Sequence, residues 1–171
     1  KQQGLEADDL AAWICGKKEE FGIDNIWLIS SDRDWDLLIR EGVSRFSTVT
    51  RKEITIDNWD DHYDVEPDMY LTMKCLAGDT GDNIPGIAGI GPKRAVTLIN
   101  DYGDLYDIYD TCPIDSKYKF IQSLNENVER LLLNAELMDL ESYSEQALIE
   151  ADMNLEDLSS QIIGYLNENR D

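Results

Sequence analysis

The first third of the chain alternates between helical and strand-like spacing of apolar side chains. Apolar residues recur at helical spacing over residues 5–21, and Gly22 follows them as a glycine does at a helix C-terminus. The run N-I-W-L-I-S at 25–30 is short, apolar and bounded by polar residues. It predicts a strand buried on both faces of a parallel sheet.

The same alternation continues to about residue 56. Ser31 and Asp32 offer capping oxygens for a second helix, which extends through Leu37 and Ile39. The stretch V-S-R-F-S-T-V alternates, and K-E-I-T-I follows it at a spacing that predicts two further strands. The order helix, strand, helix, strand favours an α/β layer.

Helical periodicity replaces the strand signals from Pro67 onward. We predict helices over residues 69–77, 92–102, 105–109, 117–124, 128–139 and 155–167, and a packing helix with an acidic surface after Leu140. The predicted fold class is therefore α/β, with a parallel-sheet portion over residues 1–65 followed by an α-helical region over residues 66–171.

Length and composition indicate an ordinary globular protein. Of the 171 residues, 42% are hydrophobic and 30% are charged, enough for one substantial core or two small ones. There is no long apolar run and no basic start with an apolar h-region, so we expect an intracellular, cytoplasmic protein with no membrane partner. The cysteines are odd in number and far apart, which favours buried thiols over disulfides or a zinc site: Cys15, Cys75 and Cys112.

The charge balance argues, on average, against a polyanionic ligand. There are 36 acids and 15 bases, for a net charge of −21, and most of the acids are expected to form a solvated surface. The exceptions are three tight acidic clusters, which contain Glu6, Asp8 and Asp9, then Asp32 and Asp34, and then Asp79 and Asp82.

Each cluster has an ordinary structural explanation: acids facing a helix dipole, a simple N-cap, or turn residues beside glycines. Together they indicate a site, because one opens a helix and another follows the C-terminal edge of a strand, where α/β sheets bind ligands. Carboxylates held close together repel one another unless cations neutralise them. Oxygen-rich sets favour Mg²⁺ or Mn²⁺, and the lone His62, expected at the surface, argues against zinc.

A turn at residues 86–91 has the features of a phosphate-binding site. It is punctuated by glycines, anchored by apolar side chains and followed by cations: Gly86, Gly89 and Gly91, Ile87 and Ile90, and Lys93 and Arg94. The glycines permit unusual dihedrals and close backbone approach, and Pro92 suits the first position of the next helix. A helix N-terminus with adjoining cations binds anions, and the pattern is that of a helix-hairpin-helix, which grips a nucleic-acid backbone without reading bases.

In this order, E-A-D-D, L-I-S-S-D-R-D-W-D and G-D-T-G-D-N-I-P-G-I-A-G-I-G-P-K-R-A resemble the flap endonuclease and 5′→3′ exonuclease family. The likeness is greatest to its phage-encoded members and to the 5′-nuclease domain of bacterial DNA polymerase I. Order and spacing match from about Gly4 to Tyr102, and the helical remainder to about Leu140 is compatible. The resemblance implies a PIN-like 5′-nuclease core followed by a helical region with a helix-hairpin-helix, or helix-3-turn-helix, motif.

The resemblance also implies residue roles. The family binds two divalent ions, which here assigns Glu6 and Asp8 to the first ion, Asp32, Asp34 and Asp82 to the second, and Asp9 and Asp79 to edge or water-mediated positions. Catalysis would depend most directly on Asp8, Asp34 and Asp82. The family's DNA contacts fall on Gly86, Gly89, Gly91, Lys93 and Arg94, and the backbone near Ile87 and Ile90 would hold a monovalent cation such as K⁺.

The implied activity is that of a structure-specific 5′-3′ exonuclease and flap endonuclease, which hydrolyses DNA phosphodiesters with two Mg²⁺ or Mn²⁺ ions. The expected substrates are 5′-flap, branched or 5′-ended duplex DNA and the RNA of RNA–DNA hybrids. We expect a monomer that acts in DNA replication, in the host-cell cytoplasm if phage-encoded. The family's N-terminal aspartates and basic arch are not visible before Lys1, so we expect this segment alone to be inactive or weakly active.

Two other functions stay open on the sequence. A non-catalytic helix-hairpin-helix module would bind duplex DNA equally with or without Mg²⁺. An acidic partner-binding or divalent-sensing protein would bind no DNA, but Lys93 and Arg94 behind the glycine turn argue against it. The tryptophans are expected in the core rather than as platforms for bases: Trp13, Trp27, Trp35 and Trp59.

Overall fold

The computed structural model describes residues 5–169, which form two compact units. The first unit comprises the described residues up to Ile56 together with those from Leu140 onward, and the second comprises Asp57–Asp139. These limits differ from the predicted boundary at residue 65, because the C-terminal helices pack with the N-terminal part of the chain.

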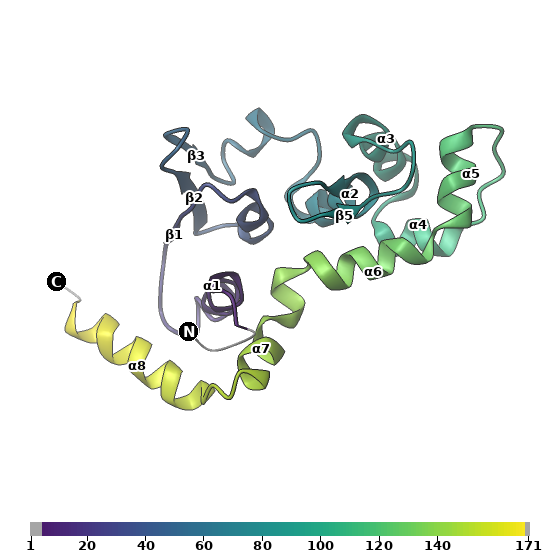
Figure 1. The fold of residues 1–171 in the computed structure, drawn as a ribbon. Coiled ribbons are helices and arrows are strands. Elements are labelled where there is room, and N and C mark those ends of the chain that lie inside the picture. The colour runs from purple at the N-terminus through teal and green to yellow at the C-terminus, as the bar shows by residue number, and fades with distance from the viewer. Residues whose placement is uncertain (1–4, 170–171) are drawn as a thin grey trace. The chain divides into compact units, whose positions relative to one another are not determined.

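The first unit combines a small sheet with helices from both ends of the chain. Its elements are α1 (Ala7–Gly16), β1 (Ile26–Ile29), the 3₁₀ helix η1 (Arg33–Leu38), β2 (Val43–Ser47), β3 (Lys52–Ile54), α7 (Leu140–Glu150) and α8 (Leu155–Glu168) (Figure 1). The helix predicted over residues 5–21 ends early, and turns lead from it to Gly22, which has a φ of 65°. The predicted helix after Asp32 is a 3₁₀ helix of six residues.

The sheet has the order β1-β2-β3 and is mixed rather than wholly parallel. Strands β1 and β2 pair in parallel, with Ile26 opposite Val43, whereas β2 and β3 are antiparallel. On β1, Leu28 is buried in a cluster with residues of α1, but Trp27 and Ile29 are 49% and 60% exposed. The predictions of a strand buried on both faces and of a core position for Trp27 were therefore wrong. Within the described residues, only one face of β1 is covered.

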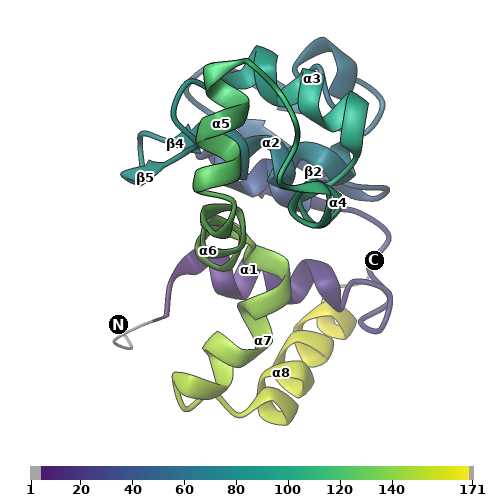
Figure 2. The same cartoon turned by 90° about the vertical axis from the view of Figure 1, so that its right-hand side faces the viewer.

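Helices α7 and α8 complete the first unit by covering α1. Figure 2 shows the ribbons of α1, α7 and α8. Leu148 of α7 is fully buried with Trp13 and Phe21, and the apolar face of α8, including Leu158 and Ile162, packs on the same cluster. The predicted packing helix after Leu140 is thus confirmed. Its buried apolar side chain, Leu148, packs with Trp13 of the N-terminal helix α1.

The second unit is almost entirely helical. Its elements are the 3₁₀ helices η2 (Trp59–Asp61) and η3 (Pro67–Met69), α2 (Tyr70–Ala77), β4 (Gly78–Asp79), β5 (Ile84–Pro85), α3 (Pro92–Tyr102), α4 (Leu105–Thr111), α5 (Lys119–Glu126) and α6 (Glu129–Met138). Helix α2 packs against both α3 and α6 (Figure 1), and a single core joins Leu76, Leu98 and Leu131. The predicted helix over residues 92–102 is confirmed.

The short pair β4 and β5 lies where no strand was predicted. Gly78 pairs with Pro85 and Asp79 with Ile84, so residues 80–83 form the connecting turn. The turn contains Asn83, which has a positive φ of 57°. Strands of two residues leave no alternating pattern in a sequence, because the turn between them sets their pairing. This hairpin carries the third acidic cluster.

Candidate metal-binding and phosphate-binding sites

In the first unit, the start of α1 and the start of η1 bring four aspartates into one electrostatic neighbourhood. Burial raises the pKa of Asp8, and the negative charges of Asp32, Asp34 and Asp9 raise it further. A hydrogen bond of 2.7 Å from Trp35 Nε1 to Asp8 Oδ1 lowers it in part. The first two predicted clusters are therefore neighbours, and a cation among them would relieve the repulsion.

Two acids of the first cluster act in the helix start itself. The carboxylate of Asp9 accepts a hydrogen bond of 3.0 Å from the backbone N–H of Glu6, which occupies the N-cap position of α1 and is exposed. This is the ordinary capping role of an acid in a first turn. Asp8 is partly buried and its pKa is raised, so its position is suggestive of a metal ligand.

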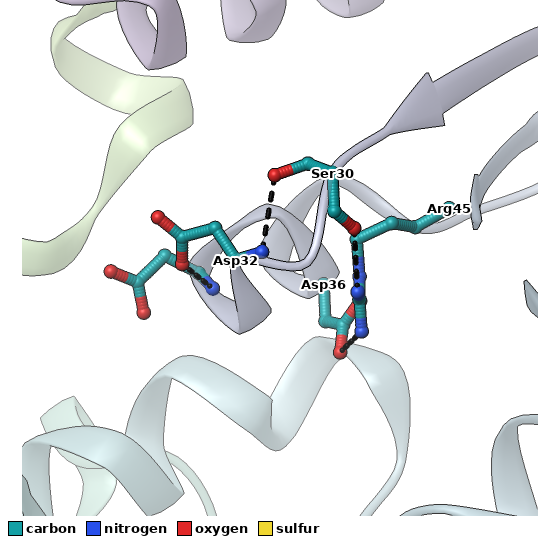
Figure 3. A network of polar contacts seen from close by, with 5 residues as sticks. Ser30, Asp32, Asp36 and Arg45 are labelled. Carbon is teal, nitrogen blue, oxygen red and sulfur yellow. Dashed lines mark hydrogen bonds and ion pairs between the residues drawn. The ribbon is translucent and has the colours of Figure 1, made fainter. Parts of the chain in front are cut away.

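The second cluster lies in the turn that connects β1 to η1. Ser30 Oγ accepts a hydrogen bond of 3.1 Å from the N–H of Asp32, and Asp32 Oδ1 accepts one of 2.9 Å from the N–H of Asp34 (Figure 3). Asp32 is thus the N-cap that its position predicted. Asp34 is half-buried, and the same turn holds both carboxylates at the end of a strand.

In the second unit, Asp79 is held from two sides. The ammonium group of Lys74, which is nearly buried, lies 2.8 Å from Asp79 Oδ2. Oδ1 accepts hydrogen bonds of 2.9 and 3.3 Å from the N–H groups of Gly81 and Asp82. The hydrogen bond from Lys74 accounts for most of the lowering of the Asp79 pKa. Asp79 is therefore ionised and oriented, and Asp82 is exposed beside it.

The candidate acids belong to two different units. That acids of both units bind the same ions stays a prediction. Within each unit the donor set fits a hard divalent ion, since every candidate ligand is a carboxylate oxygen. The pKa of Asp8 is raised first by burial and then by the charges of Asp32, Asp34 and Asp9, and a bound cation would offset both effects. Mg²⁺ and Mn²⁺ are the ions that such a set prefers.

The glycine turn at residues 86–91 is anchored as its apolar residues predicted. Ile87 and Ile90 are 3% and 4% exposed, and Ile87 N–H donates to Leu76 O over 2.9 Å. Gly91 has an extended backbone at the N-cap of α3, and Pro92 follows at the first helical position. The turn is thus anchored by two buried isoleucines, and α3 begins directly after it.

The glycines of this turn serve different purposes. A Cβ on Gly86 would lie 2.3 Å from the carbonyl carbon of Ala77, so two backbones cross there at a distance that only glycine allows. Gly89 has a φ of 80°, in the left-handed region. A Cβ on Gly91 would meet nothing within 4 Å, which leaves an open space in front of α3.

The two cations after the turn differ in their surroundings. Lys93 is exposed in the first turn of α3, whereas Arg94 donates from Nη1 to Gly89 O over 2.6 Å. The Arg94 guanidinium also lies 4.6 Å from the ring centroid of Phe120 on α5. Lys93 is placed to meet an anion, while Arg94, which is also exposed, stabilises the turn through its hydrogen bond to Gly89.

Three supporting residues were not found by sequence reasoning. Lys74 lies on a largely apolar helix, Trp35 was taken as a packing residue, and the buried Asn134 donates from Nδ2 to the carbonyls of Cys75 and Pro85, each over 2.9 Å. Trp35 and Asn134 act on partners that are distant in sequence, which no local pattern reveals, and Lys74 reaches an acid that lies five residues further along the chain, beyond the end of its own helix. No helix among residues 5–169 is long and apolar enough to cross a membrane.

The chain is similar in sequence to known proteins. Residues 65–162 match the family model described as 5′-3′ exonuclease, C-terminal SAM fold. The flap endonuclease of Escherichia phage T5 is 42% identical over 147 residues, which are 85% of this chain and 50% of that protein. DNA polymerase I of Rhizobium leguminosarum is 31% identical over 138 residues, which are 81% of this chain and 14% of that protein. The chain spans about half the length of the T5 relative.

Solved structures give the same result in three dimensions. A mutant of T5 5′-exonuclease superposes with a TM-score of 0.83 at 38% identity, over 96% of this chain and 66% of that chain. A complex of the T5 flap endonuclease with DNA and metal ions gives a TM-score of 0.83 at 38% identity, over 96% of this chain and 60% of that chain. These similarities support a 5′-nuclease fold, of mixed α/β character with mostly helices.

Proposed function

Because this chain belongs to the 5′-3′ exonuclease family, we propose that the protein is a structure-specific 5′-nuclease that hydrolyses DNA phosphodiesters as an exonuclease and flap endonuclease. The observation that carries the proposal is the position of Asp8 beside the turn of Asp32 and Asp34: burial raises the pKa of Asp8, and the charges of Asp32, Asp34 and Asp9 raise it further. Carboxylates kept together at such a cost to one another suit a divalent-ion site.

The proposed ligands come from both units. Asp8, Asp34 and Asp82 would hold two Mg²⁺ or Mn²⁺ ions most directly, supported by Glu6, Asp9, Asp32 and Asp79. When bound, two such ions lower the pKa of a water molecule and stabilise charge on the scissile phosphate. The residues themselves bind and orient: Trp35 fixes one oxygen of Asp8, and Lys74 fixes one oxygen of Asp79.

The glycine turn is proposed to bind the same DNA at a point farther along from the phosphate that is cleaved. It would form a helix-hairpin-helix, or helix-3-turn-helix, in which Lys93 and the N–H groups at the start of α3 meet a phosphate. Gly91, which faces open space, would allow the backbone of the DNA to approach, and Gly86 and Gly89 would give the turn its shape. A K⁺ ion would be held by backbone carbonyls near Ile87 and Ile90.

The proposed substrates are 5′-flap, branched or 5′-ended duplex DNA, and the RNA strand of hybrids, bound by a monomer. A backbone grip predicts cleavage that depends on strand structure and polarity, with weak base preference. The first unit would form part of a PIN-like nuclease core. The complex of T5 flap endonuclease with DNA and metal ions supports the proposal that this protein binds DNA and metal ions.

The test compares cleavage and binding of a fluorescent 5′-flap duplex by the protein and its Asp34→Ala and Asp82→Ala variants. With Mg²⁺, we expect each variant to lose about 100-fold or more in rate, as on removal of one electrostatic contributor to catalysis. With Ca²⁺ instead, DNA affinity should stay within a few-fold of wild type. The control is Asp101→Asn, because Asp101 is exposed at the end of α3.

Two outcomes would count against the proposal. DNA binding that is equal with and without divalent ions, and that shows no sign of a bound ion, would favour a non-catalytic DNA-binding module. Absence of DNA binding altogether would favour an acidic protein-binding role. Either result would be distinguished from misfolding by circular dichroism of the same samples.

A further inference from the structure

A buried ion pair lies directly behind the turn that carries Asp32 and Asp34. Arg45 on β2 and Asp36 on η1 are 3% and 1% exposed. The guanidinium contacts both carboxylate oxygens, with Nε on Oδ1 and Nη2 on Oδ2, the latter over 2.9 Å. This two-point contact fixes the orientation of Asp36 as well as its distance, since the donors of arginine form a rigid planar fork.

The same guanidinium also holds the end of β1. Arg45 Nη1 donates to Ser30 O over 2.9 Å, and Ser30 Oγ accepts from the N–H of Asp32. Asp32 in turn accepts from the N–H of Asp34. Figure 3 shows these contacts as one continuous path from Arg45 through Ser30 to Asp32, with the Asp32 carboxylate on the side away from Arg45.

Stability alone does not explain an ion pair at this position. Removing two charges from water is expensive, and apolar residues of similar volume often replace a buried pair without loss of stability. An apolar replacement would fill the same space but would hold neither Ser30 O nor the η1 carboxylate at a set distance. The distinctive contribution of the pair is therefore the geometry of the turn.

We propose that Arg45 and Asp36 are positioning residues, which fix the turn of residues 30–34 so that the carboxylates of Asp32 and Asp34 can bind a divalent ion. The inference rests on the proposed function, because it needs Asp34 to be a metal ligand. It places the control of metal affinity in two residues that are too buried to reach the ion themselves.

The experiment measures Mn²⁺ affinity of the whole protein by electron paramagnetic resonance, and thermal unfolding without metal by circular dichroism. The main variant is Arg45→Met with Asp36→Leu, which exchanges the pair for apolar side chains of similar length. We expect it to melt within about 5 °C of wild type but to bind Mn²⁺ about 10-fold or more weakly, as on loss of outer-shell support. Arg45→Lys, which keeps the charge but loses the fork, should also weaken Mn²⁺ binding if it is folded.

The matched control is Arg40→Gln, which breaks the exposed pair between Arg40 and Glu141 in the same unit and should leave Mn²⁺ affinity unchanged. Asp34→Asn separates the two levels of the argument. If it does not weaken Mn²⁺ binding, the proposed metal site fails and the positioning role fails with it. If it does, but the folded double variant or Arg45→Lys binds Mn²⁺ like wild type, the positioning role alone is refuted.

Discussion

The ammonium group of Lys74 lies 2.8 Å from Oδ2 of Asp79, so a nearly buried cation neutralises one of the acids that the glycine-rich hairpin presents. Asp79 is also fixed by two backbone N–H groups of its own turn. The hairpin therefore has a defined shape before any ion or DNA arrives. This relationship makes a direct prediction about stability and pH.

Replacing Lys74 with methionine should lower the free energy of unfolding at pH 7 by about 1–3 kcal/mol, because it leaves the Asp79 carboxylate without its charged donor. The pKa of Asp79 is lowered in the folded state, so the stabilisation is full above the unfolded pKa of about 3.9 and is lost as the pH falls through the folded pKa. Urea unfolding at pH 7 and pH 3 measures both effects.

The control for this prediction is Lys117→Met, since Lys117 is exposed and its loss should change stability by less than about 0.5 kcal/mol. A Lys74→Met deficit of the same size at both pH values would contradict the role of the ion pair. It would point to lost packing of the lysine stem instead.

The contribution of Asp8 to stability should depend on pH in the opposite sense. Its pKa is raised by burial and by Asp32, Asp34 and Asp9, so its ionisation destabilises the folded state as the pH rises from about 3.9 through the folded pKa. Asp8→Asn keeps an acceptor for Trp35 and removes the charge. We expect it to raise the metal-free stability at pH 7 by roughly 0.2–1 kcal/mol, a range discounted for partial exposure.

Divalent ions should reverse the order of the Asp8 variants. Mg²⁺ at about 10 mM should stabilise the wild-type protein by mass action and should stabilise Asp8→Asn much less. Thermal melting measures both effects. Below about pH 3 the two proteins should have the same stability. Equal stabilisation of both proteins by Mg²⁺ would show that Asp8 binds no ion.

Lys93 and Arg94 should separate DNA binding from folding. Lys93→Ala should weaken duplex binding and lower the slope of log affinity against log salt by about 1, with stability changed by less than about 0.5 kcal/mol. Arg94→Ala should cost about 1–2 kcal/mol in stability as well, because it removes the donor to Gly89 and the contact with Phe120. Salt titration by fluorescence anisotropy, with urea unfolding, distinguishes the two variants. Equal effects would mean that both cations only contact phosphate.

The cysteines should react in the order of their exposure. Burial raises the pKa of Cys15 to about 11 and that of Cys75 to about 12, whereas Cys112 is partly exposed. At pH 8 a disulfide reagent such as Ellman's reagent should modify Cys112 first and the other two only on unfolding. Because the folded thiol pKa values are raised, stability should fall as the pH rises above about 8.5. Rapid reaction of all three thiols in the folded protein would contradict this burial.

Local patterns predicted the elements whose causes are local. The helix over residues 92–102 follows from Pro92 at its start, Gly103 at its end and an apolar face between them, and the structure has it at those limits. Burial of Ile87 and Ile90 was predicted because apolar residues between glycines in a turn need a core. The same reasoning placed Asp32 as an N-cap. It failed for Trp27, because the partners that cover a strand are not encoded in the strand.

Which acids are neighbours was only partly accessible. That Asp32 and Asp34 share a turn follows from their spacing, but their effect on Asp8 depends on how α1 packs beside η1. Trp35 looked like a packing residue, and its N–H nevertheless ends on Asp8. Lys74 and Arg45 lie within largely apolar segments, and the local sequence does not indicate which acid each of them contacts.

The sequence by itself determined the helices, the acid clusters, the glycine turn with its cations and, through their order, the family to which the chain is similar. Short-range causes suffice for these, because caps, turn dihedrals and side-chain periodicity act over a few residues. Only the tertiary structure decided that residues 140–169 pack with α1, that Lys74 neutralises Asp79 and that Arg45 supports the turn of Asp32. These pairings depend on which side chains become buried and on how they are oriented, and the packing of the folded chain sets both.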